Sequence, residues 1–238
     1  MTSPLRFLQS KVRFRPIVAL YFVAALLSVI STAKADTVSL NFLGASGGNP
    51  TLVVSDPGAG YINATAVIDP YTAMVGGTKS LVWCVDPDHE VTPGQSWSAY
   101  RTQFGPGADL GKTYLGSAGA NTYGEMAWLI TQLSKATSTM SKQEIQAAIW
   151  SLGDPGDFSA SAPAGDTNFV SDVNTLEANA AINALTSGFE ILTDTRGKAQ
   201  EFVVLTPEPA TILLLGVGML GLFSLNRRKF VRRQGSMH

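Results

Sequence analysis

The stretch Ser141-Lys-Gln-Glu-Ile-Gln-Ala-Ala-Ile-Trp-Ser-Leu152 decides the fold class of this chain of 238 residues. Its apolar residues recur at the spacing of one helix face, at Ile145, Ala148, Ile149 and Leu152. Ser141 followed by Glu144 predicts a capping box at the start, and the run Gly-Asp-Pro-Gly at 153–156 predicts the end. The same period predicts two more helices, over 123–133 and within 168–185.

The rest of the chain between residues 37 and 205 favours short β-strands. Alternating or β-branched apolar runs occur at 37–42, 51–54, 61–68, 80–85, 189–192 and 201–205. Clusters of Gly, Pro and Asp separate several of them, for example at 47–50, 56–58 and 86–88. Because strands precede and follow the helices, we expect an α+β domain over 36–206, with β-sandwich or barrel-like strands framing a helical insertion.

The first 35 residues have the three parts of a secretory signal peptide. Four basic residues lie between 6 and 15, an apolar run covers 17–30, and Ala33-Lys34-Ala35 offers small residues to a signal peptidase. The apolar run, at about 14 residues, is shorter than the ~20 that span a bilayer. We therefore expect a signal helix over 1–35, cleavage after Ala35, and an exported mature protein.

The other end of the chain has a different order of parts. Pro207-Glu208-Pro209 is followed by an almost wholly apolar run over 210–225 and then by a basic cluster, namely Arg227, Arg228, Lys229, Arg232 and Arg233. This order resembles the PEP-CTERM sorting signal of Gram-negative bacteria, here over 207–233. Positive charge resists translocation, so the apolar run would be a transmembrane helix that holds the chain in the inner membrane with the basic cluster in the cytoplasm.

The resemblance to PEP-CTERM proteins implies a partner and a destination. A membrane transpeptidase of the exosortase type would cut near Pro207-Glu208-Pro209 and pass the body to the cell surface or the exopolysaccharide matrix. The body itself, 36–206, holds seven Lys or Arg against 17 Asp or Glu, which leaves about −10 of formal charge. Such a charge argues against a nucleic-acid partner, because the phosphates would be repelled.

Two short motifs in the body carry the candidate chemistry: Trp83-Cys84-Val85-Asp86 and Gln146-Ala147-Ala148-Ile149-Trp150. Together they resemble the thioester domain of bacterial surface adhesins. The resemblance implies that the sulfur of Cys84, the single cysteine, bonds to the side-chain carbonyl of Gln146 with loss of ammonia. The other candidate, Gln132, lacks the alanine and tryptophan that follow Gln146.

A thioester must be kept from water until its target arrives, because an exposed one hydrolyses. Residues i and i+4 share a helix face, so Gln146 and Trp150 lie together, beside the apolar Ile145 and Ile149. Trp150 is expected to shield the bond, with Trp83 covering it from the strand. Small side chains would let the strand approach, and the complete set expected around the bond is Trp83, Ala147, Ala148, Ile149 and Trp150.

Two function classes follow from the sequence. In the first, a lysine amine or sugar hydroxyl on a surface polymer or protein attacks the thioester once, so that the chain is an adhesin rather than an enzyme and has no catalytic residues, cofactor or metal. In the second, Cys84 is a buried thiol, and the chain is a non-covalent structural or carbohydrate-binding matrix protein that stacks sugars on Trp97, Tyr100 and Tyr114. The acidic residues after Cys84, at 86–90, favour a solvated turn over a metal site.

Overall fold

The computed structural model describes residues 36–45, 50–68, 70–206 and 216. The expected signal helix at 1–35, the Pro207-Glu208-Pro209 motif, and, apart from residue 216, the expected transmembrane helix with its basic cluster lie outside these residues. Within the described ranges, no helix has both the length and the apolar character needed to cross a membrane.

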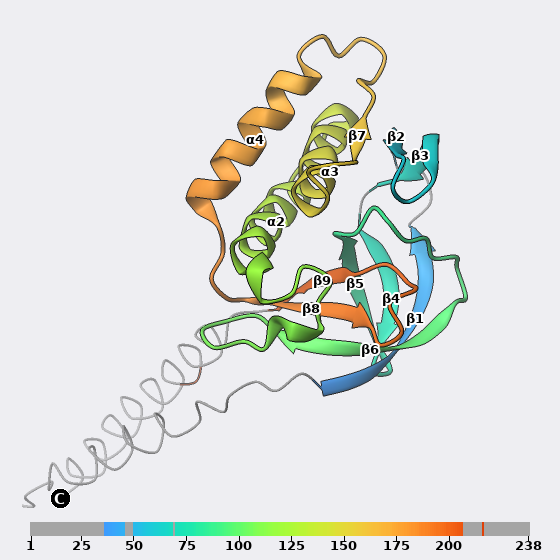
Figure 1. The fold of residues 1–238 in the computed structure, drawn as a ribbon, viewed down its shortest axis with the longest axis vertical. Helices are drawn as coiled ribbons and strands as arrows, with labels where there is room; N and C mark the ends of the chain where they lie inside the picture. Colours follow the sequence, from blue (N-terminus) through green and yellow to red (C-terminus); the bar gives the residue numbers. More distant parts are fainter. Residues whose placement is uncertain (1–35, 46–49, 69, 207–215, 217–238) are drawn as a thin grey trace, which may run out of the picture. The chain divides into compact units, whose positions relative to one another are not determined.

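Six antiparallel strands close into a barrel (Figure 1). In barrel order they are β1 (Asp36–Ala45), β4 (Tyr71–Val75), β5 (Thr78–Cys84), β9 (Phe202–Leu205), β8 (Phe189–Asp194) and β6 (Ser96–Gln103). An aromatic cluster belongs to the barrel core: the ring of Phe42 packs on Tyr71 and on Phe202, and Phe202 stacks on Trp97. The strands therefore form a closed barrel, which has no free sheet edge, rather than a sandwich.

The helical segment enters the chain between β6 and β8. It contains two 3₁₀ turns, η1 (Leu110–Lys112) and η2 (Ser117–Gly119), and the helices α2 (Ala120–Leu133), α3 (Thr139–Gly153) and α4 (Phe169–Asn183). The predicted α+β class, with strands framing a helical insertion, is confirmed. The predicted capping box is wrong, because the cap of α3 is Ser138, whose Oγ accepts a hydrogen bond from the backbone N–H of Ser141 at 3.1 Å.

A second, small antiparallel sheet lies beside α3 (Figure 1). Its order is β3 (Tyr61–Val67), β2 (Thr51–Asp56) and β7 (Ser159–Ala160). β2 and β3 form a hairpin between β1 and β4 in the sequence, whereas β7 follows α3. Gly60 in the hairpin turn has φ of 88°, a left-handed conformation that favours glycine. The hairpin and β7 thus place chain from both sides of the sequence next to α3.

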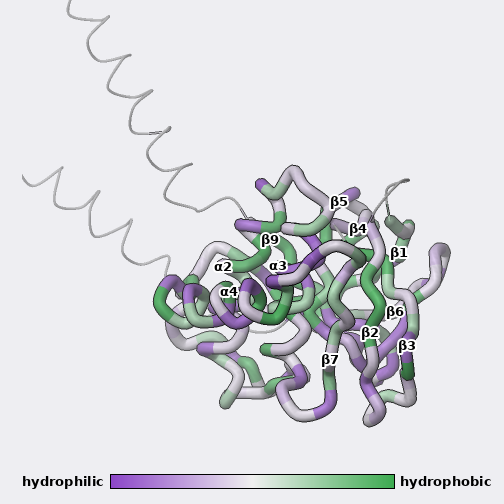
Figure 2. The backbone as a smooth tube through the Cα atoms, turned by 90° about the horizontal axis from the view of Figure 1, so that it is seen from above, coloured by the Kyte–Doolittle hydropathy of each residue, from purple (hydrophilic) through white to green (hydrophobic). Residues whose placement is uncertain are grey.

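The core lies where the helices meet the barrel. Figure 2 shows hydrophobic chain where α2 and α3 lie beside β9. All six consecutive residues of α3 from 145 to 150 are buried. A helix that contacted neighbours on one face alone would bury about half of such a run, so this part of α3 is surrounded. Gln146 therefore has buried neighbours on every side of the helix, and not only on the face that the sequence pattern indicates.

Candidate functional site

Cys84 is the last residue of β5, and it is fully buried. It pairs with Phe202 of β9, while the preceding Trp83 pairs with Val203. Paired residues of antiparallel strands point to the same face, so Cys84 faces the barrel interior with Phe202. Trp83 points to the opposite face, because successive side chains alternate. Trp83 therefore lies on the opposite face of β5 from the sulfur, which does not favour its expected role as a cover, and that role stays a prediction.

The end of β5 is open on the side away from β9. The neighbouring strand β4 begins at Tyr71, which pairs with Val82, so no strand of the barrel reaches Cys84 from that side. The side chain of Gln146 occupies this place. Its Nε2 donates a hydrogen bond of 3.1 Å to the backbone carbonyl oxygen of Cys84.

The structure therefore brings together the two residues that the sequence motifs single out. Gln146 is 1% exposed, which excludes a glutamine on the solvent face of a helix. A buried amide needs a partner, and the partner here belongs to the residue that carries the candidate sulfur. Gln132 instead donates to the hydroxyl of Thr131, its neighbour, and is only partly buried.

Trp150 lies one turn after Gln146 and is 3% exposed. Its ring packs edge-on against Phe158, with ring centroids 5.8 Å apart. Its indole N–H has no oxygen or nitrogen acceptor but approaches the Cys84 sulfur closely enough to oppose, in part, the rise in the pKa of the thiol. Trp150 thus touches the sulfur from the helix side. Ala147, Ala148 and Ile149 are buried in the same core, and their shielding role stays a prediction.

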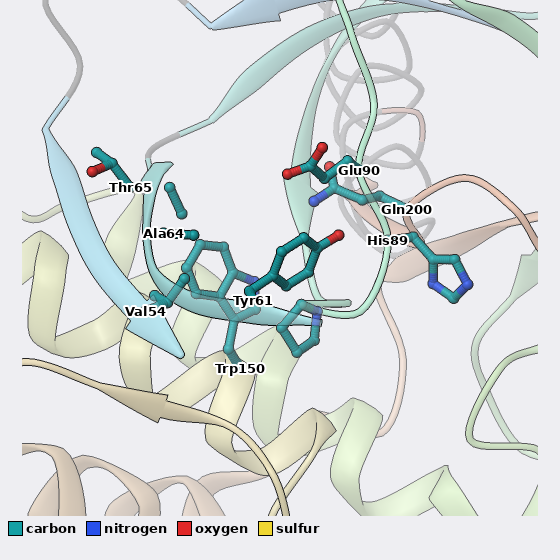
Figure 3. Close-up of a pocket in the computed structure, with 10 residues that line it drawn as sticks. Val54, Tyr61, Ala64, Thr65, His89, Glu90, Trp150 and Gln200 are labelled. Carbon is teal, nitrogen blue, oxygen red and sulfur yellow. The ribbon is translucent and has the colours of Figure 1, made fainter. Parts of the chain in front are cut away.

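A hollow lies over the other side of Trp150. It is lined by the β2–β3 hairpin, through Val54, Tyr61 and Ala64, and by the loop after β5, through His89 and Glu90. Figure 3 shows Trp150 and Tyr61 among the residues that line this hollow. Cys84 and Gln146 do not line it. Trp150 therefore stands between the hollow and the buried pair.

The environment of Cys84 opposes a charged sulfur. Burial raises the pKa of the thiol well above its ordinary value, and the negative charge of Asp86 raises it further. The Sγ–H donates to the backbone oxygen of Asp86 at 3.1 Å, which also favours the protonated sulfur, and a hydrogen bond from the backbone of Asp86 to the sulfur opposes the rise in the pKa only in part. In its free form Cys84 would therefore be a neutral thiol at neutral pH, protected from reagents in solution.

Asp86 itself is buried, so the prediction of a solvated turn is wrong at this position. Its Oδ2 accepts from the backbone N–H of Glu201 at 3.1 Å and lies 2.9 Å from Nδ1 of His89. Its Oδ1 accepts from the N–H of Asp88 at 2.9 Å. The carboxylate thus fixes the loop that follows Cys84 to the strand end at β9.

Glu201 extends this network toward the helices. It is buried, and it accepts hydrogen bonds from the hydroxyls of Tyr123 and Thr193 and from the N–H of Tyr114. Burial, with a smaller effect of the Asp86 charge, raises the pKa of Glu201 from 4.5 to about 7, although these hydrogen bonds oppose the rise. Sequence analysis did not find this residue, because its partners lie as far as 115 positions away.

The three aromatic residues proposed for sugar stacking do not share an exposed face. Trp97 is buried in the barrel, stacked on Phe202. The ammonium group of Lys112 lies 5.5 Å from the ring centroid of Tyr100, and the hydroxyl of Tyr114 donates to the carbonyl of Ala199. Trp97 is therefore not accessible for the sugar stacking that the second function class requires.

The C-terminal segment assigns the chain to the class of exported proteins that are sorted by a C-terminal signal. Residues 205–229 match the PEP-CTERM protein-sorting motif. A protein with this motif is anchored in the membrane before an exosortase processes it, and it is then released to the outside. The recognition of the sorting signal from Pro207, Glu208 and Pro209 is confirmed.

Among curated proteins, none matches the sequence of this chain. Among solved structures, the N-terminal thioester domain of a surface protein from Clostridium perfringens is similar to it, with 14% sequence identity and a TM-score of 0.38. The similarity covers 71% of this chain and 98% of the other. At this TM-score the similarity assigns no function to the chain.

Proposed function

We propose that this exported protein forms an internal thioester between Cys84 and Gln146 and uses it to attach covalently to a partner outside the cell. The observation that supports the proposal best is the 3.1 Å hydrogen bond from the Gln146 amide to the Cys84 carbonyl in a site closed to solvent. A glutamine is otherwise an expensive residue to bury, and a role in the bond explains its place.

The first step exchanges an amide for a thioester. The Cys84 sulfur attacks the side-chain carbonyl carbon of Gln146, the carbon–nitrogen bond breaks, and ammonia leaves with the proton of the thiol. The amide must first turn from the carbonyl oxygen of Cys84 to the sulfur of the same residue, a movement within one side chain. The product is uncharged, so the burial that disfavours a thiolate does not disfavour the thioester.

The second step links the protein to its partner. An amine or hydroxyl attacks the thioester carbonyl, the carbon–sulfur bond breaks, and an amide or ester of residue 146 remains. The sulfur leaves as a thiol, because it takes up the proton that the nucleophile loses. The raised pKa of Cys84 favours this protonated leaving group. Each molecule reacts once, so the protein is an adhesin and not an enzyme.

The partner must enter past Trp150. The hollow between the β2–β3 hairpin and the loop after β5 leads to this side chain. A lysine amine or the hydroxyl of a surface polysaccharide, presented on a larger molecule, is small enough to reach the bond once the indole has moved aside. The sorting signal would place the exosortase-processed body at the cell surface or in the exopolysaccharide, where such partners occur.

The mass of the intact protein tests the proposal. The full chain, purified in detergent, should be lighter by one ammonia than its sequence requires, and methylamine should add its own mass to that species. Cys84→Ala and Gln146→Ala should each show the full mass of their own sequence, and Gln132→Ala should keep the loss of ammonia. A wild-type chain at full mass would leave the non-covalent matrix protein as the explanation.

Labelling of the cysteine must be done after unfolding. Cys84 is buried, so a reagent would fail to reach it in the native protein whether or not the bond exists. In denaturant, a maleimide should label the methylamine-treated protein and not the untreated one. Equal labelling of both samples contradicts the thioester.

Replacing Trp150 tests its role as the cover of the bond. Trp150→Ala should lose about 3–5 kcal/mol of stability through the cavity it leaves. The thioester of this variant should also be hydrolysed by water, and the variant should then be heavier by one water than the thioester form of its own sequence. Trp150→Phe keeps a ring in place and removes only the contact of the indole N–H with the Cys84 sulfur, so it should keep the lighter mass. Hydrolysis at the wild-type rate in Trp150→Ala would exclude the shielding role.

A further inference from the structure

Three aspartates that are far apart in the sequence meet beside the candidate thioester site. Asp56 ends β2, Asp88 lies in the loop four residues after Cys84, and Asp154 follows the last turn of α3. One carboxylate oxygen of each lies within 4.8 Å of the other two. Each aspartate stands next to a proline in a turn, so the three turns present their acidic groups to one point.

The second observation concerns Asp56, which is 1% exposed. Its Oδ1 accepts a hydrogen bond of 3.0 Å from the N–H of Ala59. Its Oδ2 is buried and has no hydrogen-bond partner among the described residues. The carboxylate that carries this oxygen faces the Asp88 and Asp154 side chains. A buried carboxylate oxygen without a partner is costly, and a bound cation is one of the few groups that would satisfy it.

The charges around Asp88 are all of one sign. The neighbouring Asp56, Asp86 and Asp154 all place negative charge beside the Asp88 carboxylate. Two basic side chains of the described part of the chain are engaged elsewhere, since His89 pairs with Asp86 and Arg101 with Glu190. Neither of these two side chains therefore relieves the repulsion between the three carboxylates.

The spacing of the three oxygens fits Ca²⁺. Oxygen ligands lie about 2.3–2.6 Å from Ca²⁺, so two of them can be up to about 5 Å apart, and Ca²⁺ accepts several protein oxygens, whereas Mg²⁺ is usually bound by one or two carboxylates and keeps several waters. A Cβ at Gly58 would lie 2.7 Å from Oδ2 of Asp157 and 3.4 Å from Oδ1 of Asp56, so a fourth carboxylate lies close by.

We infer that Asp56, Asp88 and Asp154 bind one calcium ion, which fastens the β2–β3 hairpin and the loop after β5 to the end of α3. The same hairpin and loop line the hollow over Trp150. The ion would thus hold closed the elements that separate the buried Cys84–Gln146 pair from solvent. An exported protein meets calcium at the concentrations that extracellular sites use, with dissociation constants of about 10⁻⁴–10⁻³ M. For calcium, the sequence expectation of no metal considered only the acidic residues at 86–90, which supply one turn of this site.

Calcium titration of the full chain in detergent, after removal of metal with a chelator, tests the inference. Isothermal titration calorimetry should show one Ca²⁺ per chain with a dissociation constant in that range, and Mg²⁺ should bind at least about tenfold more weakly. Asp56→Asn and Asp88→Asn should each weaken calcium binding about tenfold or more. Asn keeps the acceptor for Ala59, so Asp56→Asn should fold, and without calcium it should melt no lower than the wild type because it removes a repelled charge.

A second acidic cluster of the molecule supplies the matched control. Glu144, Asp166 and Asp172 also lie within 4.8 Å of one another, and Asp166 is buried. Asp166→Asn should keep calcium binding unchanged. Loss of binding in Asp166→Asn together with its retention in Asp56→Asn would overturn the inference, as would equal affinity for Mg²⁺ or no binding by the wild type. Cys84→Ala should bind calcium like the wild type, so the test does not depend on the thioester.

Discussion

Replacing Glu201 with glutamine should change how the stability of the protein depends on pH. The pKa of Glu201 is about 7 in the folded protein and about 4.5 when the chain is unfolded. An acid with a raised pKa holds its proton more tightly in the folded state. Its contribution to stability is therefore complete below about pH 4.5 and is lost as the pH rises through about 7. Glutamine resembles the protonated acid at every pH.

The size of the effect follows from the pKa shift. A difference of about 2.5 units at about 1.4 kcal/mol per unit corresponds to about 3 kcal/mol. Glu201 is buried, so this value needs no reduction for screening by solvent. The free energy of unfolding of Glu201→Gln minus that of the wild type should thus rise by about 3 kcal/mol from about pH 4 to about pH 8. The groups facing Glu201 are Asp86, Tyr114, Tyr123 and Thr193, and all are present in both proteins.

Urea unfolding at a series of pH values measures this difference. Both proteins should carry Cys84→Ala, so that no thioester is opened during unfolding. The subtraction removes the titration of other carboxylates, such as Asp86, whose pKa is also raised by burial. A difference that stays constant within about 0.5 kcal/mol over the range would refute the raised pKa of Glu201.

Two further substitutions test how the helices are placed. Gly124→Ala in α2 should cost about 1–3 kcal/mol of stability, because its Cβ would lie 2.5 Å from the backbone oxygen of Leu185. Thermal melting measures this loss. In the control Gly156→Ala the new Cβ meets no atom within 4 Å, so stability should change by less than about 1 kcal/mol. Ser138→Ala should lower the free energy of unfolding in urea by about 1 kcal/mol, because α3 loses its N-cap. A larger decrease in Ser141→Ala would show that Ser141 is the cap, as the sequence pattern indicates.

Periodicity predicted the elements whose patterns are strong and missed those whose patterns are weak. The three helices and the strands β1, β2, β3, β5, β8 and β9 lie where the apolar runs predict them. β6 was missed because Ser96-Trp-Ser-Ala-Tyr-Arg-Thr-Gln103 is half polar, and β4 because Tyr71-Thr-Ala-Met-Val75 includes weak strand formers. Both strands are held by their neighbours in the barrel, which a local pattern does not include.

Some residues of the candidate site could likewise be predicted from the sequence, and others could not. Cys84 and Gln146 could be named from two short motifs, and the structure places them in contact. That Trp83 and Cys84 point to opposite faces follows from alternation along the predicted strand, but which elements cover each face depends on the closed barrel and could not be predicted. Asp86 and Glu201 carry no local signal either, since a buried carboxylate and a solvated one look alike in a sequence. Their burial becomes apparent only once the closed barrel is known.

β5, which carries Cys84, pairs with β9, and β9 ends at residue 205. The barrel therefore cannot close beside Cys84 until the chain up to residue 205 has been synthesised and translocated. Before that point the closed barrel that brings Cys84 and Gln146 together does not exist. If the proposed thioester forms, the topology therefore places secretion before bond formation. A thioester formed only after delivery would not expose the cell that makes the protein to its electrophile.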